Sequence, residues 1–264
     1  MKQKNKFETD VKKNGRPFFD PSVQYLRQNP GNGPRSFYRI LSTELFKGTV
    51  LDLGSGEGRF HRHFERYGHK WIGLDIVKNK DVTVIADAHT LPFAIESFDC
   101  VFSNCTLEHL RDPKLSVFEV HRVLKLGGLF VGNVAFMEPF HKSYFNMTHW
   151  GLEYILLSAG FKNLKIQPGY SLSSLVNKYL FMENPEIFGI SHKIVILLTK
   201  IILSFVEYMA FAYARIKYGR RSGKYMEIYE YYDKKLPFIL AGSLLFWCNK
   251  DVSIKAKSIV RSSI

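Results

Sequence analysis

The stretch VLDLGSGEGRF, residues 50–60, places three glycines within five positions directly after a short apolar run. An apolar run that ends in glycines is typical of a buried strand turning tightly into a helix, where a ligand can approach the backbone closely. A triphosphate loop would need Lys and Ser or Thr after the last glycine. A dinucleotide fingerprint would need glycine at Arg59. Neither of these two phosphate-binding motifs is therefore present.

From residue 49 onward, short apolar segments alternate with helical patterns, which predicts an α/β fold with a parallel sheet covered on both faces. We expect strands at TVLDLG, WIGLDI, VTVIADA, FDCVFSN and LFVGNVAF, and a last one in PFILAGSLLFWCNKD. Helices are expected at 36–46, 59–67 and 114–124, the last ended by Gly127–Gly128. Ligands bind at the carboxyl ends of strands in such sheets. The residues expected there are Gly54 to Gly58, Asp75, Asp87 and Asn104.

The position of Asp75 indicates what the ligand contains. Asp75 follows Gly54 by 21 residues, close to the offset at which an acidic residue binds the ribose of a nucleotide cofactor. A carboxylate can accept hydrogen bonds from both ribose hydroxyls. The glycine spacing bends the backbone without forming a pyrophosphate cradle, so we expect a ligand with a ribose and little negative charge. S-adenosylmethionine, which has a cationic sulfonium and no phosphate, meets both conditions.

Four segments together resemble the class I S-adenosylmethionine-dependent methyltransferases of the type with D-A-x-x-L-P-F after the third strand: VLDLGSGEG, GLDI, DAHTLPFAIESFDCVFSN and HRVLKLGGLFV. The resemblance covers roughly residues 45–165. It implies a Rossmann-like, doubly wound sheet of seven strands in the order 3-2-1-4-5-7-6, with the seventh strand antiparallel.

The same resemblance implies a set of cofactor contacts. The glycine loop would pass under the methionine and ribose, and Asp52 would orient the loop and meet the methionine amine through water. Asp75 would bind the ribose hydroxyls, and Asp87 the adenine amino group. The residues implied are Asp52, Gly54, Ser55, Gly56, Gly58, Asp75, Asp87, Ala88 (through its backbone) and Asn104 (beside the sulfonium).

Histidines are the candidate catalytic bases. Methyl transfer requires alignment of the nucleophile, and a hydroxyl acceptor also needs a base. His109 follows the fourth strand in TLEHL, at the edge where the acceptor is expected, and His141 follows the fifth strand. The alternative for each, as for His149, is a structural histidine. The cysteines form no metal-ligand spacing, and we expect no metal.

The substrate class is suggested by a second, looser resemblance. EPFHKSYFNMTHWGLEYILLSAGF is similar to a methyltransferase subgroup associated with surface polysaccharide and other cell-envelope biosynthesis. We therefore expect a small-molecule, glycan or lipid-linked acceptor. The alternatives are a catalytically silent binding subunit, a quinone or lipid methyltransferase, and an RNA methyltransferase. Nucleic acid is disfavoured because residues 51–189 carry a net charge of −1 and read N-C-T-L where a base-stacking N-P-P-[FY] motif would stand.

Charge and composition divide the chain into parts. Of the net charge of +13, residues 1–50 carry +6 and residues 190–264 carry +8. We expect a basic flexible arm and loop at 1–35, a methyltransferase domain at 36–250 and a basic tail at 251–264. Three scattered cysteines and the absence of an apolar leader indicate the cytoplasm.

Residues 190–235 are expected to form an apolar and basic helical insertion. Within it, IVILLTKIILSFVEYMAFAYA at 194–214 is interrupted by Lys200 and Glu207, and RIKYGRRSGK follows. Three alternatives are open for this segment: packing on the core, lying on an anionic membrane surface through 194–224, or spanning the bilayer. We favour the core narrowly over the surface, and both over the span. A surface helix would make the protein peripheral on the inner face of the membrane.

Overall fold

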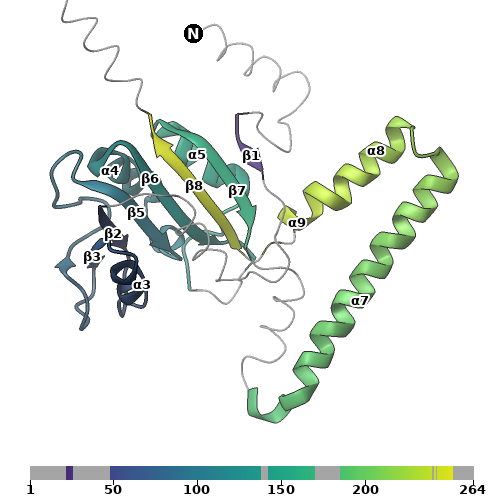
Figure 1. The fold of residues 1–264 in the computed structure, drawn as a ribbon, viewed down its shortest axis with the longest axis horizontal. Helices are drawn as coiled ribbons and strands as arrows, with labels where there is room; N and C mark the ends of the chain where they lie inside the picture. Colours follow the sequence, from purple (N-terminus) through teal and green to yellow (C-terminus); the bar gives the residue numbers. More distant parts are fainter. Residues whose placement is uncertain are drawn as a thin grey trace, which may run out of the picture.

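The computed structural model describes residues 22–25, 48–137, 142–169, 185–239, 241 and 243–251. Its centre is an eight-stranded sheet in the order β1-β7-β8-β6-β5-β2-β3-β4 (Figure 1). The β8 strand is antiparallel to both of its neighbours, and the other pairs are parallel. The strands are β1 Gln24–Tyr25, β2 Thr49–Leu53, β3 Lys70–Asp75, β4 Val84–Ile85, β5 Phe98–Asn104, β6 Leu124–Ala135, β7 Phe161–Pro168 and β8 Ser243–Lys250.

Helices cover both faces of this sheet. On one face α3 (His61–Arg66) packs Phe64 into a cluster with Trp71 and Phe102. On the other face, α4 (Pro113–Val123) and α5 (His149–Ser158) bury Val120 and Leu152 in the larger cluster. Apolar strands buried on both faces are the reason for the nearly continuous apolar runs in the sequence. The predicted α/β, doubly wound class is confirmed.

The strand order implied by the resemblance is found, with one addition at the edge. The strands β4, β3, β2, β5, β6, β8 and β7 follow the order 3-2-1-4-5-7-6, and β1 then pairs with β7. Val23 beside it is 7% exposed, and the Tyr25 hydroxyl donates to the buried Glu153 carboxylate of α5. For Gln24–Tyr25 the expectation of a loose arm is therefore corrected. The rest of 1–35, the 36–46 helix and the tail beyond Asp251 lie outside the described residues.

The glycine pair at 127–128 does not end a helix as expected. The Asp112 side chain caps the start of α4 by accepting from the Leu115 amide at 2.9 Å, and the helix ends at Val123. The β6 strand begins directly at Leu124 and then slips in register, because Leu124 pairs with Phe98 whereas Leu129 pairs with Cys100. Gly127 has φ 77°, a left-handed conformation that glycine adopts readily, so the glycine pair allows the register shift inside the strand.

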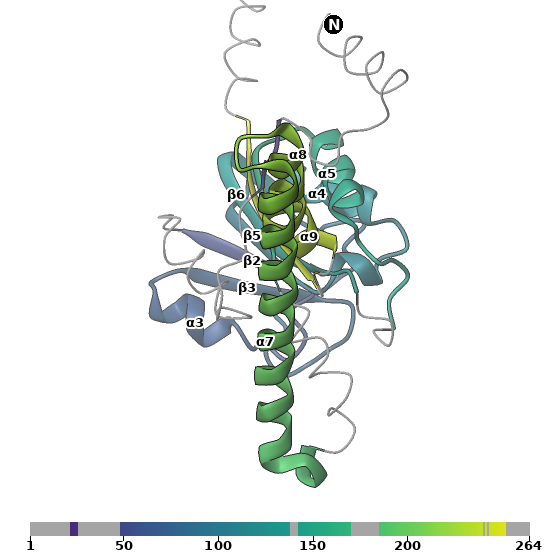
Figure 2. The ribbon, with the colours of Figure 1, turned by 90° about the vertical axis from the view of Figure 1, so that its right-hand side faces the viewer.

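The 190–235 segment is helical. It contains most of α7 (Pro185–Tyr218), α8 (Gly223–Glu230) and the π-helical turn Tyr231–Lys235. The short helix α9 (Leu236–Ile239) follows it directly. Residues 237–239, which we expected at the start of the last strand, are therefore helical. Figures 1 and 2 show α7 as a long rod that stands beside the sheet domain and is joined to it through α8 and α9.

Our preference for packing 194–214 on the core is corrected by the exposure of its side chains. Among the side chains of α7 that the structure describes, eleven large apolar ones are exposed, with Ile201 at 54%, Phe205 at 60% and Ile216 at 86%. The sequence does not distinguish a helix packed on the core from an exposed one, since the apolar pattern of a helix face is the same whatever covers it. None of the helices in the described ranges combines the length and the hydropathy that a bilayer-spanning segment requires.

Candidate cofactor and acceptor site

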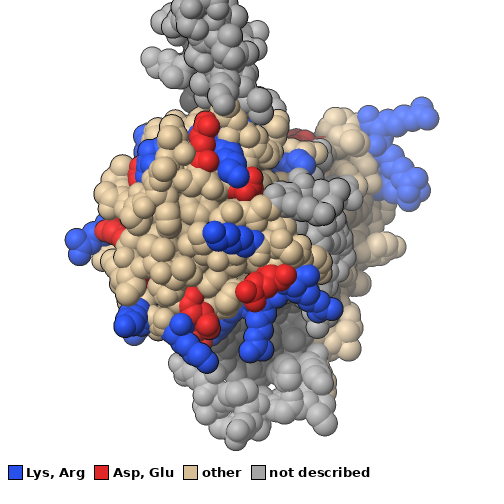
Figure 3. Space-filling model, turned by 60° about the vertical axis from the view of Figure 1, so that its left-hand side comes forward, with Lys and Arg blue, Asp and Glu red and all other residues tan. Residues whose placement is uncertain are grey.

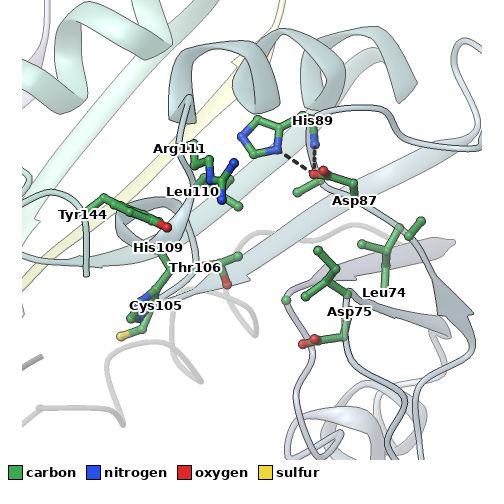
Figure 4. Close-up of a pocket in the computed structure, with 14 residues that line it drawn as sticks. Leu74, Asp75, Asp87, His89, Cys105, Thr106, His109, Leu110, Arg111 and Tyr144 are labelled. Carbon is green, nitrogen blue, oxygen red and sulfur yellow. Dashed lines mark hydrogen bonds and ion pairs between the residues drawn. The ribbon is translucent and has the colours of Figure 1, made fainter. Parts of the chain in front are cut away.

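A cavity of about 630 Å³ opens at the carboxyl ends of β2, β3, β4 and β5 (Figure 4). This volume is typical of a small-molecule site. Its wall is formed on one side by strand ends and the glycine loop, and on the other by the segment after β5. Of the predicted cofactor residues, four line the cavity, namely Gly54, Asp75, Asp87 and Ala88, and so does the predicted base His109.

The glycine loop begins with a backbone conformation that excludes a side chain. Gly54 has φ 74°, and a Cβ there would lie 2.3 Å from the Thr106 hydroxyl oxygen. The amides of Gly54 and Ser55 both donate to the Leu74 carbonyl, at 2.8 and 3.0 Å, and the Thr106 hydroxyl donates to the Leu53 carbonyl at 3.0 Å. The loop is therefore fixed between the ends of β3 and β5 by its backbone.

Asp75 connects the end of β3 to the loop. One carboxylate oxygen accepts from the Gly56 amide at 2.9 Å, and the other accepts from the Val77 amide at 2.9 Å. Gly56 has φ 53°, and a Cβ there would meet no atom within 4 Å, so the space above the loop is open. Each carboxylate oxygen has two lone pairs, so Asp75 can hold the loop and still accept from a ligand hydroxyl.

Asp87 is held by His89, a residue that the sequence reasoning missed. One Asp87 oxygen accepts from the His89 amide at 2.9 Å and lies 2.5 Å from His89 Nδ1. His89 Nε2 accepts from the Asp112 amide at 3.1 Å, which places the ring proton on Nδ1 toward Asp87. These hydrogen bonds lower the pKa of Asp87, so it is ionised at neutral pH. The Asp87–His89 sequence spacing alone carries no signal for this contact.

Asp52 lies beneath the site and not in the cavity wall. It is 2% exposed, and its carboxyl accepts from the Trp71 indole nitrogen on β3 at 3.1 Å. Burial raises its pKa to about 7. The implied contact with the methionine amine would have to form from this buried position. The carboxyl contacts the neighbouring strand, and the loop is held by Asp75 and Thr106 instead.

The remaining predicted cofactor residues border the cavity. Ser55 is buried below the loop, and Gly58 has φ 68° with its Cα facing the side chain of Asp81. Asn104 ends β5, where its amide oxygen lies 3.4 Å from the Asn133 side-chain nitrogen. The next residue, Cys105, has φ 52° and does line the cavity. Asn104 thus immediately precedes a residue of the cavity wall in the sequence, but it does not line the cavity itself.

His109 lies on the opposite wall, where a neighbouring carbonyl fixes its tautomer. Its Nδ1 lies 3.1 Å from the Lys142 carbonyl oxygen. A carbonyl can only accept, so Nδ1 carries the proton and the lone pair of the neutral imidazole is on Nε2. The amides of Tyr144 and Phe145 both donate to the Glu108 carbonyl, at 2.9 and 3.1 Å. His109 and the 142–145 segment therefore form one wall, while His141 lies outside the described residues.

Two further residues of this wall were missed. Arg111 is exposed and is the sole Lys or Arg among the residues that line the described cavity, and Tyr144 lies beside it (Figure 4). Glu108 anchors this segment to β6, since its buried carboxylate accepts from the Ala135 amide at 2.8 Å. In the run T-L-E-H-L-R, Arg111 stands two residues after the predicted base His109. This short spacing could have indicated Arg111 as a site residue.

Comparison with known proteins decides which fold family this site belongs to. Residues 51–132, which carry the glycine loop, Asp75, Asp87 and His109, match the family model described as a methyltransferase domain. Residues 51–132 thus belong to a class I S-adenosylmethionine-dependent methyltransferase domain. The family predicted from the sequence motifs is confirmed, although the D-A-x-x-L-P-F subtype is not tested by the match. S-adenosylmethionine is the cofactor of this domain.

Relatives share this region and not the whole chain. A malonyl-[acyl-carrier protein] O-methyltransferase of Hamiltonella defensa is 30% identical over 104 residues, 35% of this chain and 40% of that protein. A demethylmenaquinone methyltransferase of Thermobifida fusca is 35% identical over 108 residues, 35% of this chain and 46% of that protein. The chain thus spans about half the length, or less, of these relatives.

The fold extends beyond the matched region. The crystal structure of the [4+2]-cyclase SpnF superposes with a TM-score of 0.52 at 15% identity, and the match covers 95% of this chain and 94% of that one. This likeness shows a shared fold, since the identity is low.

Proposed function

We propose that the protein transfers a methyl group from S-adenosylmethionine to a small-molecule, glycan or lipid-linked acceptor. The observation that carries the proposal is one cavity with the carboxylates of Asp75 and Asp87 on one wall and the imidazole of His109 on the other. Two carboxylates against one guanidinium in the lining suit a cationic ligand. The cavity is therefore matched to the cofactor in charge as well as in size.

In this proposal, the glycine loop and the strand ends hold the cofactor. Asp75 accepts from the ribose hydroxyls with the lone pairs that the Gly56 and Val77 amides leave unused. Asp87, kept ionised by His89, accepts from the adenine amino group next to the Ala88 backbone. Gly54, Ser55, Gly56 and Gly58 run beneath the methionine and ribose, with Asn104 toward the sulfonium and Asp52 below.

His109 then acts as the base for a hydroxyl acceptor. The cofactor supplies a methyl carbon activated by the positive sulfonium. Nε2 of His109 would accept the hydroxyl proton as the acceptor oxygen takes the methyl group. The Lys142 carbonyl stabilises the resulting imidazolium by accepting from Nδ1. An acceptor that is already anionic would need orientation only, and Arg111 on the same wall could hold it.

The acceptor class rests on the sequence of residues 138–161 and its similarity to cell-envelope methyltransferases. His141 lies in that segment and is the second candidate base. The named relatives act on an acyl-carrier-bound malonyl group and on a quinone, so this domain family includes acceptors of different chemistry. A catalytically silent binding subunit is the alternative, because the cofactor pocket and the acceptor site are separate and an intact pocket does not by itself require an active acceptor site.

Transfer of label from S-adenosylmethionine distinguishes these readings. The protein would be incubated with methyl-labelled cofactor and cell extract separated into lipid, glycan, small-molecule and nucleic-acid fractions. Label in one of the first three fractions, absent with Asp75→Ala, supports the proposal. Label in nucleic acid would contradict the acceptor class. Tight cofactor binding without label in any fraction would support the silent subunit.

A further inference from the structure

One side of α7 forms a continuous apolar surface that no described residue covers. At roughly 100° per residue, its exposed apolar side chains fall within about half of the helix circumference. They extend over residues 194–216, which is about 35 Å of helix. The members of this apolar face are Ile194, Leu197, Leu198, Ile201, Ile202, Phe205, Val206, Tyr208, Met209, Tyr213 and Ile216.

The opposite side of α7 is the one that packs on the protein. Ala214 is completely buried, and the Phe211 ring lies 5.5 Å from the Tyr229 ring and 5.7 Å from the Tyr232 ring. Both tyrosines belong to α8 and the turn after it, which Figure 2 shows alongside the upper part of α7. The C-terminal part of the helix is therefore held from behind, and the apolar face there points away from its support.

Basic side chains border the apolar face at one end. On the helical wheel, Arg215 and Lys217 lie at its two edges. Arg220, Arg221 and Lys224 follow in the turn to α8 and are exposed. Lys224 pairs with Glu227 at 2.9 Å, and Lys217 donates to the Tyr213 hydroxyl at 2.7 Å. For the three arginines, the described residues supply no carboxylate. Figure 3 shows Lys and Arg projecting at this end, whereas the core domain carries both signs.

We propose that α7 and the basic turn after it bind the surface of an anionic lipid bilayer. The helix would lie in the plane of the surface, with the apolar face in the acyl boundary and the arginines at the lipid phosphates. A second copy of the chain suits this face less well. The described side chains of the apolar face include no carboxylate, so a copy packed there would leave the arginines unpaired.

Vesicle flotation tests the binding itself. We expect the protein to float with vesicles of phosphatidylglycerol and phosphatidylcholine and to stay at the bottom with phosphatidylcholine alone. Raising the salt from 0.1 M to 1 M should release part of it, since the Debye length falls from about 10 Å to about 3 Å. Equal binding to both vesicles, or to neither, would overturn the proposal. The assay needs no cofactor or acceptor, so it is independent of the proposed methyl transfer.

Two variants and their controls locate the contact. Arg215→Gln/Arg220→Gln/Arg221→Gln should weaken binding to the anionic vesicles at least about tenfold. Arg62→Gln/Arg66→Gln/Lys70→Gln, which removes three exposed charges from the core domain, should leave binding unchanged. Ile202→Glu/Phe205→Glu should abolish binding, whereas Tyr67→Glu/Ile95→Glu should not. Equal losses in a variant and its control would place the contact elsewhere and overturn the assignment to α7.

A fluorescent reporter distinguishes lipid from a second copy. Ile202→Trp should shift its emission to the blue with anionic vesicles and be quenched by brominated acyl chains, because residue 202 would enter the acyl boundary. A concentration-dependent blue shift without lipid, together with dimers in sedimentation velocity that Ile202→Glu/Phe205→Glu removes, would show that a second copy covers the face. That result would overturn the membrane proposal.

Discussion

The Asp75 carboxylate accepts from the Gly56 amide at 2.9 Å, so the residue proposed to bind ribose also holds the glycine loop in place. Through this bond, the end of β3 and the turn after β2 act as a single unit. A change at either residue therefore affects the shape of the loop and the contact with the ligand together. The effects at these two positions should not be additive.

Removing the Asp75 carboxylate should weaken cofactor binding. Asp75→Ala loses the acceptor for the ribose hydroxyls and leaves the Gly56 amide without its partner, so we expect a loss of about 1.5–3 kcal/mol in binding free energy. Isothermal titration calorimetry with S-adenosylhomocysteine measures it. Glu65→Ala, an exposed carboxylate paired with His61 in α3, is the control and should bind normally. Binding by Asp75→Ala equal to wild type would contradict the ribose assignment.

Two glycines with left-handed backbones should differ in their tolerance of a methyl group. Gly54 has φ 74° and Gly68 has φ 79°, so alanine at either costs about 1–2 kcal/mol of stability for the backbone. At Gly68 the added Cβ meets nothing within 4 Å, whereas at Gly54 it would lie 2.3 Å from Thr106 Oγ1. We expect Gly54→Ala to lose further stability and most cofactor binding, measured by urea unfolding and calorimetry. Equal behaviour of the two variants would show that the loop adjusts.

The catalytic and structural roles of His109 can be separated by His109→Asn. The asparagine amide can still donate to the Lys142 carbonyl, but it has no basic nitrogen to replace Nε2. If His109 is the base, turnover in the fraction that takes the label should fall about 10²–10⁴-fold with cofactor affinity nearly unchanged. If asparagine restores activity that His109→Ala loses, the role is to hold the 142–145 wall. An unchanged rate in both variants would leave His141 as the candidate.

Asp52 should make the free energy of unfolding depend on pH. Its pKa is raised by burial from 3.8 to about 7. Between these two pH values, the folded state therefore keeps the Asp52 proton that the unfolded state has lost. Stability from this group is present below about pH 4 and is lost as the pH rises through 7. Asp52→Asn keeps an acceptor for Trp71 and removes the charge. We therefore expect it to be more stable than wild type at pH 8, by a few kcal/mol at about 1.4 kcal/mol per pKa unit.

Asp99 provides a comparison of opposite sign for the same urea titrations. Burial alone would raise its pKa, but hydrogen bonds from the Lys125 ammonium and the Thr49 amide lower it below 3.8. Its contribution is present above pH 4 and is lost on acidification. Asp99→Asn should therefore destabilise the protein at neutral pH and much less at pH 3. If Asp52→Asn also destabilised at pH 8, its carboxylate would be stabilising in the folded state.

Much of the sheet and one wall of the site follow from the sequence. Apolar runs of strand length alternating with helical patterns leave few arrangements other than a doubly wound sheet. Once the strands are parallel, their carboxyl ends lie at one edge, and Gly54, Asp75 and Asp87 are brought together by topology alone. The glycine pair at 127–128 was misread because a glycine that ends a helix and one that allows a bulge have the same local signature.

The other wall depended on contacts between distant residues. The His89 ring lies between Asp87 and the amide of Asp112, and His109 meets the carbonyl of Lys142, 33 residues along the chain. No periodicity encodes such loop contacts. For α7, in contrast, the sequence itself determined that a long apolar helix is followed by basic residues. Only the tertiary structure decided that α8 packs behind it, leaving Phe205 and its neighbours exposed. The physical reason is that the hydrophobic effect depends on the area removed from water and not on which partner covers it.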